Sequence, residues 1–272
     1  FVLVAELWCQ HGLWWTGGLE AVRVYYRAVS AEEISIVMGG ENGGGEGEGE
    51  GDGGVDGLVA HFSFDGNLTD SVDGDVGVAS MTPQFDAGRF GAALWFDGGD
   101  DKLTVSAASL PSGNAARTLS LWAKDADPSG HDWKFAANWG VPDSSKAFGL
   151  IRGDNGQGPG RWYGYWHGSP DVDSNVTVTS NWTHFAVTHD GSAMRVYADG
   201  ALGGSLQNVT LQTTGPDFVL GASQMSEIPM WWKGWLDDVR VYDRALSAEE
   251  ISIVMNGGGG EEGGGSHGTE LP

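Results

Sequence analysis

The chain has a single cysteine, Cys9, among 272 residues. Residues 57–255 contain none, so disulfide bonds cannot stabilise a domain folded from this region in any redox compartment. The seven histidines are scattered, and no cluster of Cys and His with the spacing of a zinc site is present. The sequence therefore predicts a domain that depends on its apolar core, or on hard oxygen ligands, for stability.

Basic residues are also few. Lys and Arg number 14 against 37 Asp and Glu, which gives a formal net charge of −23. Such a balance argues against nucleic acid and against anionic membrane surfaces as partners, and it is compatible with a demand for cations. No apolar run is long enough for a membrane-spanning helix. The first residue is Phe1, so the lack of a signal peptide carries no information about secretion.

Glutamate is scarce in residues 57–255, where only Glu227, Glu249 and Glu250 occur. Glycoside hydrolysis needs two placed carboxylates, and no Asp pair shows a catalytic spacing either. A nucleophile motif of the G-x-S-x-G type is absent. Catalysis, as a glycoside hydrolase of the glucanase type, is therefore the least favoured of the functions considered.

The most informative feature that is present is an internal repeat. Phe1–Met38 aligns without a gap onto Phe218–Met255, and in its best-matched part, Trp14–Met38 against Trp231–Met255, 19 of 25 positions are identical. This repeat predicts a tandem array with a period of 217 residues. We interpret residues 1–38 as the C-terminal remnant of a preceding module of the same type. Strand exchange into another chain is the alternative.

Glycine, with 46 residues, is concentrated in two acidic runs, Gly39–Gly54 and Gly257–Gly265. Such segments cannot bury enough apolar surface to offset their backbone entropy, and like charges keep them extended. We therefore predict linkers at 39–56 and 256–272, with one complete domain at 57–255.

Between the linkers, short alternating runs separated by Asp-Gly turns indicate strands almost throughout. Trp182–His189 and Ala193–Ala198 flank Asp190 and Gly191, the residues of a tight hairpin turn. One helix follows, with a capping box formed by Ser247 and Glu250. The pattern predicts an all-β, antiparallel two-sheet jelly-roll sandwich with one short C-terminal helix. A propeller is excluded because no period of about 40–50 residues occurs inside the domain.

Five segments in the same order resemble those of LamG-like jelly-roll domains of the concanavalin A-like lectin/glucanase superfamily, of the kind found in bacterial surface repeat proteins. They read LVAHFSFDGNLTDSVDG, GRFGAALWFDGGDDKLTV, TLSLWAK, NWTHFAVTHDGSAMRVYADGAL and GWLDDVRVYDRALSAEEI. The resemblance implies a concanavalin A-like sandwich of two curved sheets in an extracellular or cell-surface protein. It implies no single function, because the fold hosts lectins, glucanases and structural modules. The E-x-D-x-x-E strand of the related laminarinase-type enzymes is absent.

Acidic and amide side chains make a first candidate site. Asp65, Asn67 and Asp70 lie in the loop after the first strand, and Asp237 enters the last strand. Hard oxygen ligands of this kind suit Ca²⁺. An EF-hand is excluded because the loop lacks the required Gly and Glu and has no flanking helices. The alternative is that these residues only form turns and accept backbone N–H groups.

Strand parity separates the two late carboxylates. Asp237 shares its parity with Val239 and Val241, which predicts that it points toward the core, where a carboxylate needs an ion or several donors. The first copy of the repeat keeps an acid here, Glu20, and has Ala21 at the position of Asp238. We therefore expect Asp237 to be the ligand. The resemblance agrees, because calcium often joins the first and last segments of similar domains.

Aromatic side chains make a second candidate site. The chain has 13 tryptophans, and the middle of the domain is rich in aromatic residues whose strand carries them on both faces. At least one of these faces is therefore not simply core, and sugar rings stack on exposed aromatic faces. The predicted ligand-binding residues are Trp133, Trp139, Trp162, Tyr163, Tyr165, Trp166 and His167. The alternative is that they form the sandwich core and contacts between modules.

Together these features predict a non-catalytic extracellular adhesion or carbohydrate-binding module, stabilised by Ca²⁺, whose partner is a glycan or a cell-surface or matrix ligand. Acidic glycine linkers would let weak sites on neighbouring modules bind together and raise avidity. The alternative function is a structural spacer in a surface stalk.

Overall fold

The computed structural model describes residues 55–130, 132–154, 160–224 and 230–258. The chain divides into two units, Phe1–Gly40 and Glu41–Pro272. The predicted remnant at 1–38 and most of both predicted linkers lie outside the described residues. All that follows concerns the second unit.

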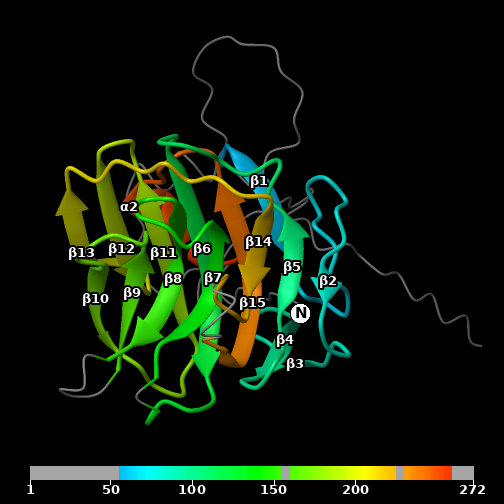
Figure 1. The fold of residues 1–272 in the computed structure, drawn as a ribbon. Helices are drawn as coiled ribbons and strands as arrows, with labels where there is room; N and C mark the ends of the chain where they lie inside the picture. The colour runs from blue at the N-terminus through cyan, green and yellow to red at the C-terminus, as the bar shows by residue number, and fades with distance from the viewer. Residues whose placement is uncertain (1–54, 131, 155–159, 225–229, 259–272) are drawn as a thin grey trace, which may run out of the picture. The chain divides into compact units, whose positions relative to one another are not determined.

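Fifteen strands and one described helix make up this unit (Figure 1). Their bounds are β1 Leu58–Phe62, β2 Val78–Ala79, β3 Phe85–Ala87, β4 Ala92–Asp97, β5 Leu103–Ser106, β6 Arg117–Asp125, β7 Lys134–Gly140, β8 Ala147–Gly153, β9 Arg161–Tyr165, β10 Val172–Thr177, β11 Thr183–His189, β12 Ala193–Ala198, β13 Ala201–Gln207, β14 Asp217–Leu220, β15 Lys233–Tyr242 and α2 Ala248–Met255.

The strands form two antiparallel sheets. The eight-stranded sheet has the order β13-β12-β11-β6-β15-β4-β3, with β1 also paired to β15, and the seven-stranded sheet has the order β10-β9-β8-β7-β14-β5-β2. Two antiparallel sheets packed face to face, with the chain crossing repeatedly between them, confirm the predicted jelly-roll sandwich. The hairpin predicted at Asp190 and Gly191 joins β11 to β12 in register, with His189 opposite Met194.

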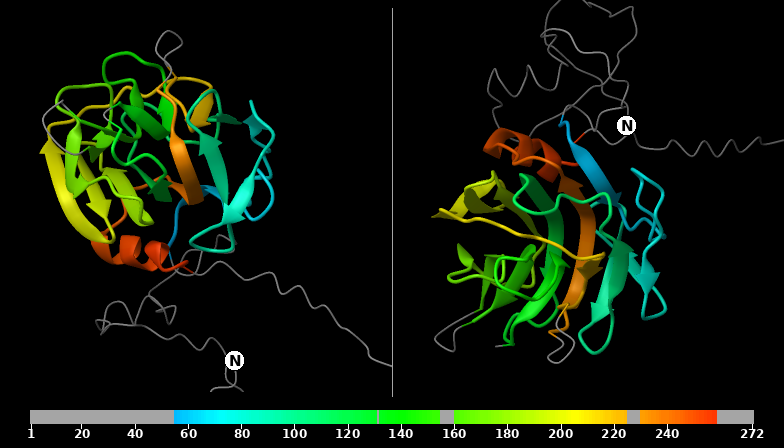
Figure 2. Two further views of the ribbon diagram at one scale, coloured as in Figure 1. Left: turned by 90° about the horizontal axis from the view of Figure 1, so that it is seen from below. Right: turned by 45° about the horizontal axis from the view of Figure 1, so that its top comes forward.

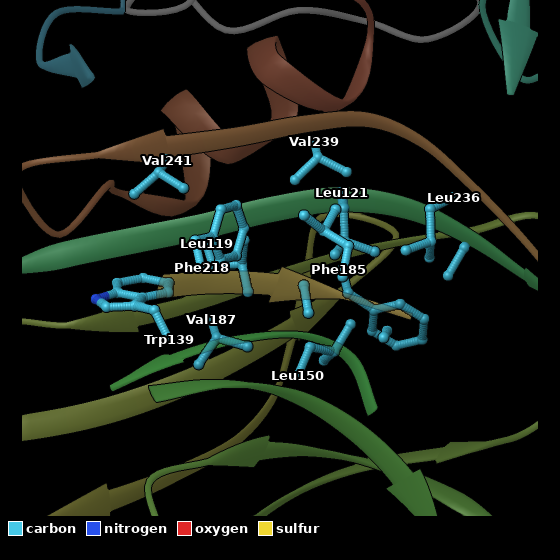
Figure 3. Packing of buried hydrophobic residues seen from close by; sticks show 14 of the residues in the cluster. Leu119, Leu121, Trp139, Leu150, Phe185, Val187, Phe218, Leu236, Val239 and Val241 are labelled. Atoms are coloured by element: carbon cyan, nitrogen blue, oxygen red, sulfur yellow. The ribbon is translucent and has the colours of Figure 1, made fainter. Parts of the chain in front are cut away.

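The main core lies between the sheets. Leu119 and Leu121 of β6 alternate with outward-facing residues and meet Trp139 and Phe218 from the seven-stranded sheet (Figure 3). All four side chains are buried. Because side chains alternate along a strand, each sheet contributes only one of its faces to this core. The other face of each sheet remains free to carry a site or to accept a covering element.

At one edge the sheets approach so closely that glycine is required. A Cβ atom on Gly203 of β13 would lie 2.0 Å from the carbonyl oxygen of Ser174 on β10, and one on Gly204 would lie 2.1 Å from that of Asp173. The side-chain amide of Asn175 also donates to the Gly203 carbonyl at 2.7 Å. These contacts join the edge strands of the two sheets.

The two ends of the domain meet. β1 pairs with the C-terminal half of β15, and α2 covers the outer face of the eight-stranded sheet through Ile251 and Val254 (Figure 2). Val55 is buried in the same cluster, so the folded region begins before the predicted linker boundary at residue 57. The Arg244 guanidinium donates to the Asp56 carbonyl at 2.8 Å.

The predicted capping box is present at the start of α2. Ser247 Oγ accepts from the Glu250 N–H at 3.2 Å, and Glu250 Oε2 accepts from the Ser247 N–H at 2.8 Å. Replacing Ser247 with Ala removes one of these acceptors, so we expect the free energy of unfolding to fall by about 1 kcal/mol. Chemical denaturation would measure this, with Ser252→Ala on the same helix as the control. A change equal to that of the control would contradict the capping role.

Candidate functional site

A bulge in β15 decides where the two late carboxylates point. Asp238 has a φ of 49°, and the pairing of β15 with β6 shifts between Asp237 and Arg240. As a result both Leu236 and Val239 belong to the core, and Asp237 lies opposite Trp122 on the outer face of the sheet. The parity prediction that Asp237 points into the core is therefore wrong, because an inserted residue reverses the alternation.

Asp237 is nevertheless fully buried, under the hairpin that joins β3 to β4. Its Oδ2 atom accepts from the backbone N–H groups of Arg89 at 2.6 Å and Phe90 at 2.9 Å. The Arg89 guanidinium carbon lies 4.7 Å from the ring centroid of Trp122. The Phe90 ring centroid lies 6.3 Å from the same point. The hairpin thus forms a lid over the carboxylate.

Asp65 holds the same hairpin from its other side, because its Oδ1 atom accepts from the Ala92 N–H at 2.7 Å. A Cβ atom on Gly91 would lie 2.0 Å from Asp65 Oδ1, and one on Gly88 would lie 2.5 Å from Asp237 Oδ2. The glycines are therefore needed for both carboxylates to approach the turn. Asp65 after the first strand and Asp237 in the last strand therefore both bind the backbone of this hairpin.

The second oxygen of Asp237 has a different environment. Oδ1 is buried and has no hydrogen-bond partner among the described residues. The pKa of Asp237 is raised to about 7, mainly by burial and to a smaller extent by the charges of Asp238 and Asp65, while the two backbone N–H groups oppose the rise. A buried carboxylate oxygen without a donor, beside a second carboxylate, fits the hard oxygen donor set that Ca²⁺ prefers.

The other two predicted metal ligands have local partners. Asn67 Oδ1 accepts from the Thr69 N–H at 2.9 Å. Asp70 Oδ1 accepts from the N–H groups of His61 at 2.9 Å and Val72 at 2.8 Å, which ties the loop to β1. Their observed contacts are the turn-forming ones that the sequence left as the alternative.

Asp238 belongs to a separate ion-pair network. Its Oδ1 atom lies 2.8 Å from His61 Nε2 and 3.0 Å from Arg240 Nε. These partners keep the pKa of Asp238 low, although burial opposes them. Another acidic group, Asp97, Asp100 and Asp101, has ligand atoms within 4.8 Å of one another in the described part of the chain. Asp97 and Asp101 in this group also accept local backbone N–H groups.

Two of the predicted aromatic ligands are core residues. Trp139 and Trp162 are 2% and 3% exposed between the sheets, so they cannot contact an external ligand. The Trp162 ring centroid lies 4.4 Å from that of Phe185 and 5.2 Å from that of Trp232. This part of the aromatic prediction is wrong. Trp166 is partly exposed, packs against the core, and donates from Nε1 to the Pro170 carbonyl at 3.0 Å.

Tyr163 and Tyr165 alternate with Trp162 and therefore occupy the outer face of the seven-stranded sheet. With Trp133, Phe135 and His167 they form what we call the outer aromatic cluster. Ring centroids are 5.3 Å apart for Trp133 and Tyr163, 4.8 Å for Phe135 and Tyr165, and 5.9 Å for Tyr165 and His167. Of the cluster, Trp133 and His167 are partly exposed.

The Trp133 ring lies flat on backbone, because a Cβ atom on Gly153 of β8 would be 2.3 Å from it. Glycine at this position therefore lets an indole cover the strand. The contact orients Trp133 at the margin of the cluster, where a sugar ring could stack on its exposed side.

A polar group that the sequence did not single out accompanies this cluster. Asp171 Oδ1 is buried without a hydrogen-bond partner among the described residues. Burial raises the pKa of Asp171 to about 6, and the Trp166 N–H partly opposes the rise. The Asp171 charge also helps to raise the pKa of Tyr165, after the larger effect of burial. Nothing in the sequence marks Asp171, since a lone Asp after Pro170 is ordinary in a loop.

Comparison with known proteins agrees with this geometry. A family model described as the concanavalin A-like lectin/glucanases superfamily matches residues 97–252. The chain belongs to this superfamily. The likeness predicted from the sequence is thus confirmed, and the superfamily includes both sugar-binding and sugar-cleaving members. No curated protein matches the chain.

Several solved structures resemble this one over most of the domain. Domain 4 of an extracellular arabinanase from Geobacillus stearothermophilus, solved with arabinotriose, is 25% identical, with a TM-score of 0.59, and the match covers 73% of this chain and 98% of that one. The receptor-binding domain of a botulinum neurotoxin C/D mosaic is 18% identical, with a TM-score of 0.57, over 74% and 51%. The serotype D domain with N-acetylneuraminic acid is 18% identical, with a TM-score of 0.55, over 74% and 51%. The chain spans about half of each toxin domain, and these two likenesses show the fold alone.

Within the described residues, no helix has the length and apolar character needed to cross a membrane.

Proposed function

We propose that residues 55–258 form a non-catalytic carbohydrate-binding module of an extracellular, tandemly repeated protein, stabilised by Ca²⁺. The observation that carries the proposal is the outer aromatic cluster together with the unpartnered Asp171 oxygen. An aromatic surface with one placed acceptor is the combination that binds a sugar ring and one of its hydroxyl groups.

The sugar would stack on Trp133 and reach the polar groups beside Tyr165. Asp171, which is partly exposed, would accept a hydrogen bond from a sugar hydroxyl. His167, whose ring lies 5.9 Å from that of Tyr165, would bind a second hydroxyl at the margin. The arabinanase domain solved with arabinotriose makes a short arabino-oligosaccharide the first ligand to test.

Calcium would bind between Asp65 and Asp237. The unpartnered Asp237 Oδ1 supports this assignment, because an ion would satisfy that oxygen and offset the repulsion between the charges of Asp237 and Asp65. Its role would be structural: the ion would hold the hairpin at 88–91 against the first and last strands. Asn67 is a weaker candidate because its one side-chain oxygen already accepts a backbone N–H group, and Asp70 is weaker because its Oδ1 atom ties the loop to β1 and not to the hairpin.

The roles of the described glutamates support a non-catalytic module. Glu250 caps α2, and its Oε1 atom forms an ion pair with Arg244 Nη2 at 2.7 Å. Glu249 lies in the first turn of the same helix. Glu227 lies outside the described residues. Because α2 packs on the eight-stranded sheet and the aromatic cluster lies on the other sheet, neither helical glutamate supplies an acid beside that cluster.

The position of the domain ends bears on the spacer alternative. Val55 and Val254 share one cluster, and Arg240 donates to the Gly258 carbonyl at 3.3 Å. The preceding and following linkers therefore leave from neighbouring points. A module whose two ends lie close together projects to the side of a tandem array and adds little to the array's end-to-end length. This geometry favours a binding role over that of a rigid spacer.

Replacing Trp133 with Ala should weaken binding of arabino-oligosaccharides, or of the best ligand on a glycan array, by at least tenfold. The Ala variant loses the stacking surface, and Asp171→Asn should weaken binding by a similar factor because it removes the charge and replaces one carboxylate oxygen with an amide donor. Isothermal titration with the purified domain measures both. Trp231→Ala, at another partly exposed tryptophan, is the control. If the wild-type protein binds no glycan, the carbohydrate-binding proposal is wrong and the structural spacer remains. If the wild-type protein hydrolyses a glucan, the module is an enzyme.

A further inference from the structure

A second aromatic surface lies on the opposite sheet, away from the outer aromatic cluster. Trp95 of β4 and Trp235 of β15 are directly paired across the strands, with ring centroids 4.4 Å apart and an interplanar angle of 51°. Both alternate with core residues, Leu94 and Leu236, so they project from the outer face of the eight-stranded sheet. Both are partly exposed.

Polar groups hold this Trp95–Trp235 pair in one arrangement. Trp235 Nε1 donates to Asp86 Oδ2 of β3 at 2.8 Å, and the Lys124 ammonium of β6 lies 4.8 Å from the Trp235 ring centroid. Lys124 is directly opposite Trp235 in the sheet, so the three side chains form a row across three strands. A surface fixed in this way loses little conformational entropy when a ligand stacks on it.

The core does not require a tryptophan at position 235. In the first copy of the repeat, Gly18 occupies this position, while the core residues of the strand are unchanged. Four of the six differences between Trp14–Met38 and Trp231–Met255 fall between positions 233 and 238 of the second copy. The two copies thus share their core pattern and differ mainly on the outer face of this strand, as expected where copies differ in what they bind.

Hydrogen-bonding groups remain available beside the pair. Neither Lys124 nor Lys233 has a carboxylate oxygen within 4.0 Å among the described residues, although the chain is strongly acidic. Asp86 is exposed and accepts one hydrogen bond, from Trp235, which leaves further lone pairs free. The surface therefore combines two indoles with a donor on one side and an acceptor on the other.

We propose that the Trp95–Trp235 pair is a second saccharide-binding site, which takes a neutral sugar ring. The ring stacks on the exposed indole surface, Lys124 donates to one hydroxyl and Asp86 accepts from another. A charged ligand is less suited, because the donor and the acceptor carry opposite charges. This site goes beyond the proposed function, since it lies on the other sheet and makes one module able to bind two glycan chains.

The test is titration of the intact chain with arabinotriose, cellohexaose, laminarihexaose and mannohexaose. In a Trp133→Ala, Asp171→Asn background only the second site remains, and we expect one sugar bound per chain. Adding Trp235→Gly, the residue of the first copy, should weaken this binding at least tenfold, and Trp95→Ala should do the same. Leu202→Ala, at an exposed apolar residue on β13, should have no effect. Near-ultraviolet circular dichroism confirms that each variant is folded.

The outcomes separate the two proposals. Loss of all binding in the Trp133→Ala, Asp171→Asn protein would overturn the second site and leave the proposed function intact. Binding that survives there but disappears with Trp235→Gly supports the second site, and binding insensitive to Trp133→Ala alone would count against the first. No binding of any of the four sugars by wild type would overturn the second site. Concentration-dependent dimerisation abolished by Trp235→Gly would instead assign the pair to contact between copies.

Discussion

Replacing Asp237 with Asn should abolish stabilisation of the domain by calcium. With a calcium concentration of about 100 times the dissociation constant, wild-type protein should gain about 2.7 kcal/mol of unfolding free energy. For a domain of this size that corresponds to a rise in melting temperature of about 5–10 °C. The Asn side chain can still accept from Arg89 and Phe90, but it lacks the second carboxylate oxygen that the ion would need. Thermal melting with calcium and with chelator measures the difference.

The controls for this experiment are matched carboxylates. Asp65→Asn should reduce the calcium effect, whereas Asp86→Asn, on the neighbouring strand β3, should leave it unchanged. An identical calcium-induced shift in wild type and Asp237→Asn would show that the ion binds elsewhere, for example at Asp97, Asp100 and Asp101. No shift in wild type would leave Asp65 and Asp237 as acceptors for the hairpin backbone only.

The same variant should behave differently with pH when calcium is absent. The pKa of Asp237 is raised from 3.8 to about 7 in the folded protein, so the folded state binds a proton that the unfolded state has released. The contribution of protonated Asp237 to the unfolding free energy is therefore complete below about pH 4 and is lost as the pH rises to about 7. Asp237→Asn, which stays neutral, should match wild type near pH 4 and exceed it by about 2–4 kcal/mol at neutral pH.

Urea denaturation in chelator across this pH range gives the difference between the two proteins. The other acidic groups are common to both, so their contributions cancel. Calcium should reverse the trend in wild type, because the ion binds the ionised carboxylate and its effect should grow as the pH rises toward neutrality. A constant difference between wild type and Asp237→Asn from pH 4 to 7.5 would mean that Asp237 does not titrate in this range.

Replacing Trp162 with Ala should lower the unfolding free energy by about 3–5 kcal/mol. The indole is 3% exposed and packs against Phe185 and Trp232, so its removal leaves a cavity between the sheets that surrounding side chains cannot fill. The melting temperature should fall by about 10 °C or more. Chemical and thermal denaturation measure both quantities.

Trp133→Ala is the matched comparison, because it removes an indole from the outer face of the same sheet. We expect it to cost about 1 kcal/mol and to weaken glycan binding, whereas Trp162→Ala should retain binding at temperatures where it is folded. A destabilisation of less than about 1 kcal/mol by Trp162→Ala would contradict the core position. The pair thus separates aromatic residues that hold the sandwich together from those that meet a ligand.

Local sequence patterns predicted much of the fold correctly. Alternation and Asp-Gly turns indicated the strands and the β11–β12 hairpin, and the capping box of Ser247 and Glu250 located α2. These features depend on residues a few positions apart, whose geometry the backbone determines directly. The repeat and the glycine runs lie largely outside the described residues, so the division into modules stays a prediction.

The candidate sites were only partly predictable. Loop position, strand parity, the repeat and the family resemblance together pointed to Asp65 and Asp237, although the parity step was wrong, and composition marked the aromatic segment as rich in candidates. The alternation of Trp162 with Tyr163 was read correctly, but the sequence did not reveal which face was core, because both faces are aromatic. No sequence pattern marked Asp171 as a site residue. The Trp95–Trp235 pair was missed because its two residues lie far apart in the chain.

The residues alone were sufficient for several of the strands, the β11–β12 turn, the helix cap and the superfamily, since short-range sterics and hydrogen bonds determine such local features. Strand pairing was needed to decide which acid is buried under a hairpin, which tryptophans meet solvent, and which carboxylate oxygens lack a donor. A single bulge at Asp238 reversed the side-chain alternation of β15, and such an insertion arises from the register between distant strands. Burial and register are properties of the assembled sheets, and no local pattern in the chain encodes them.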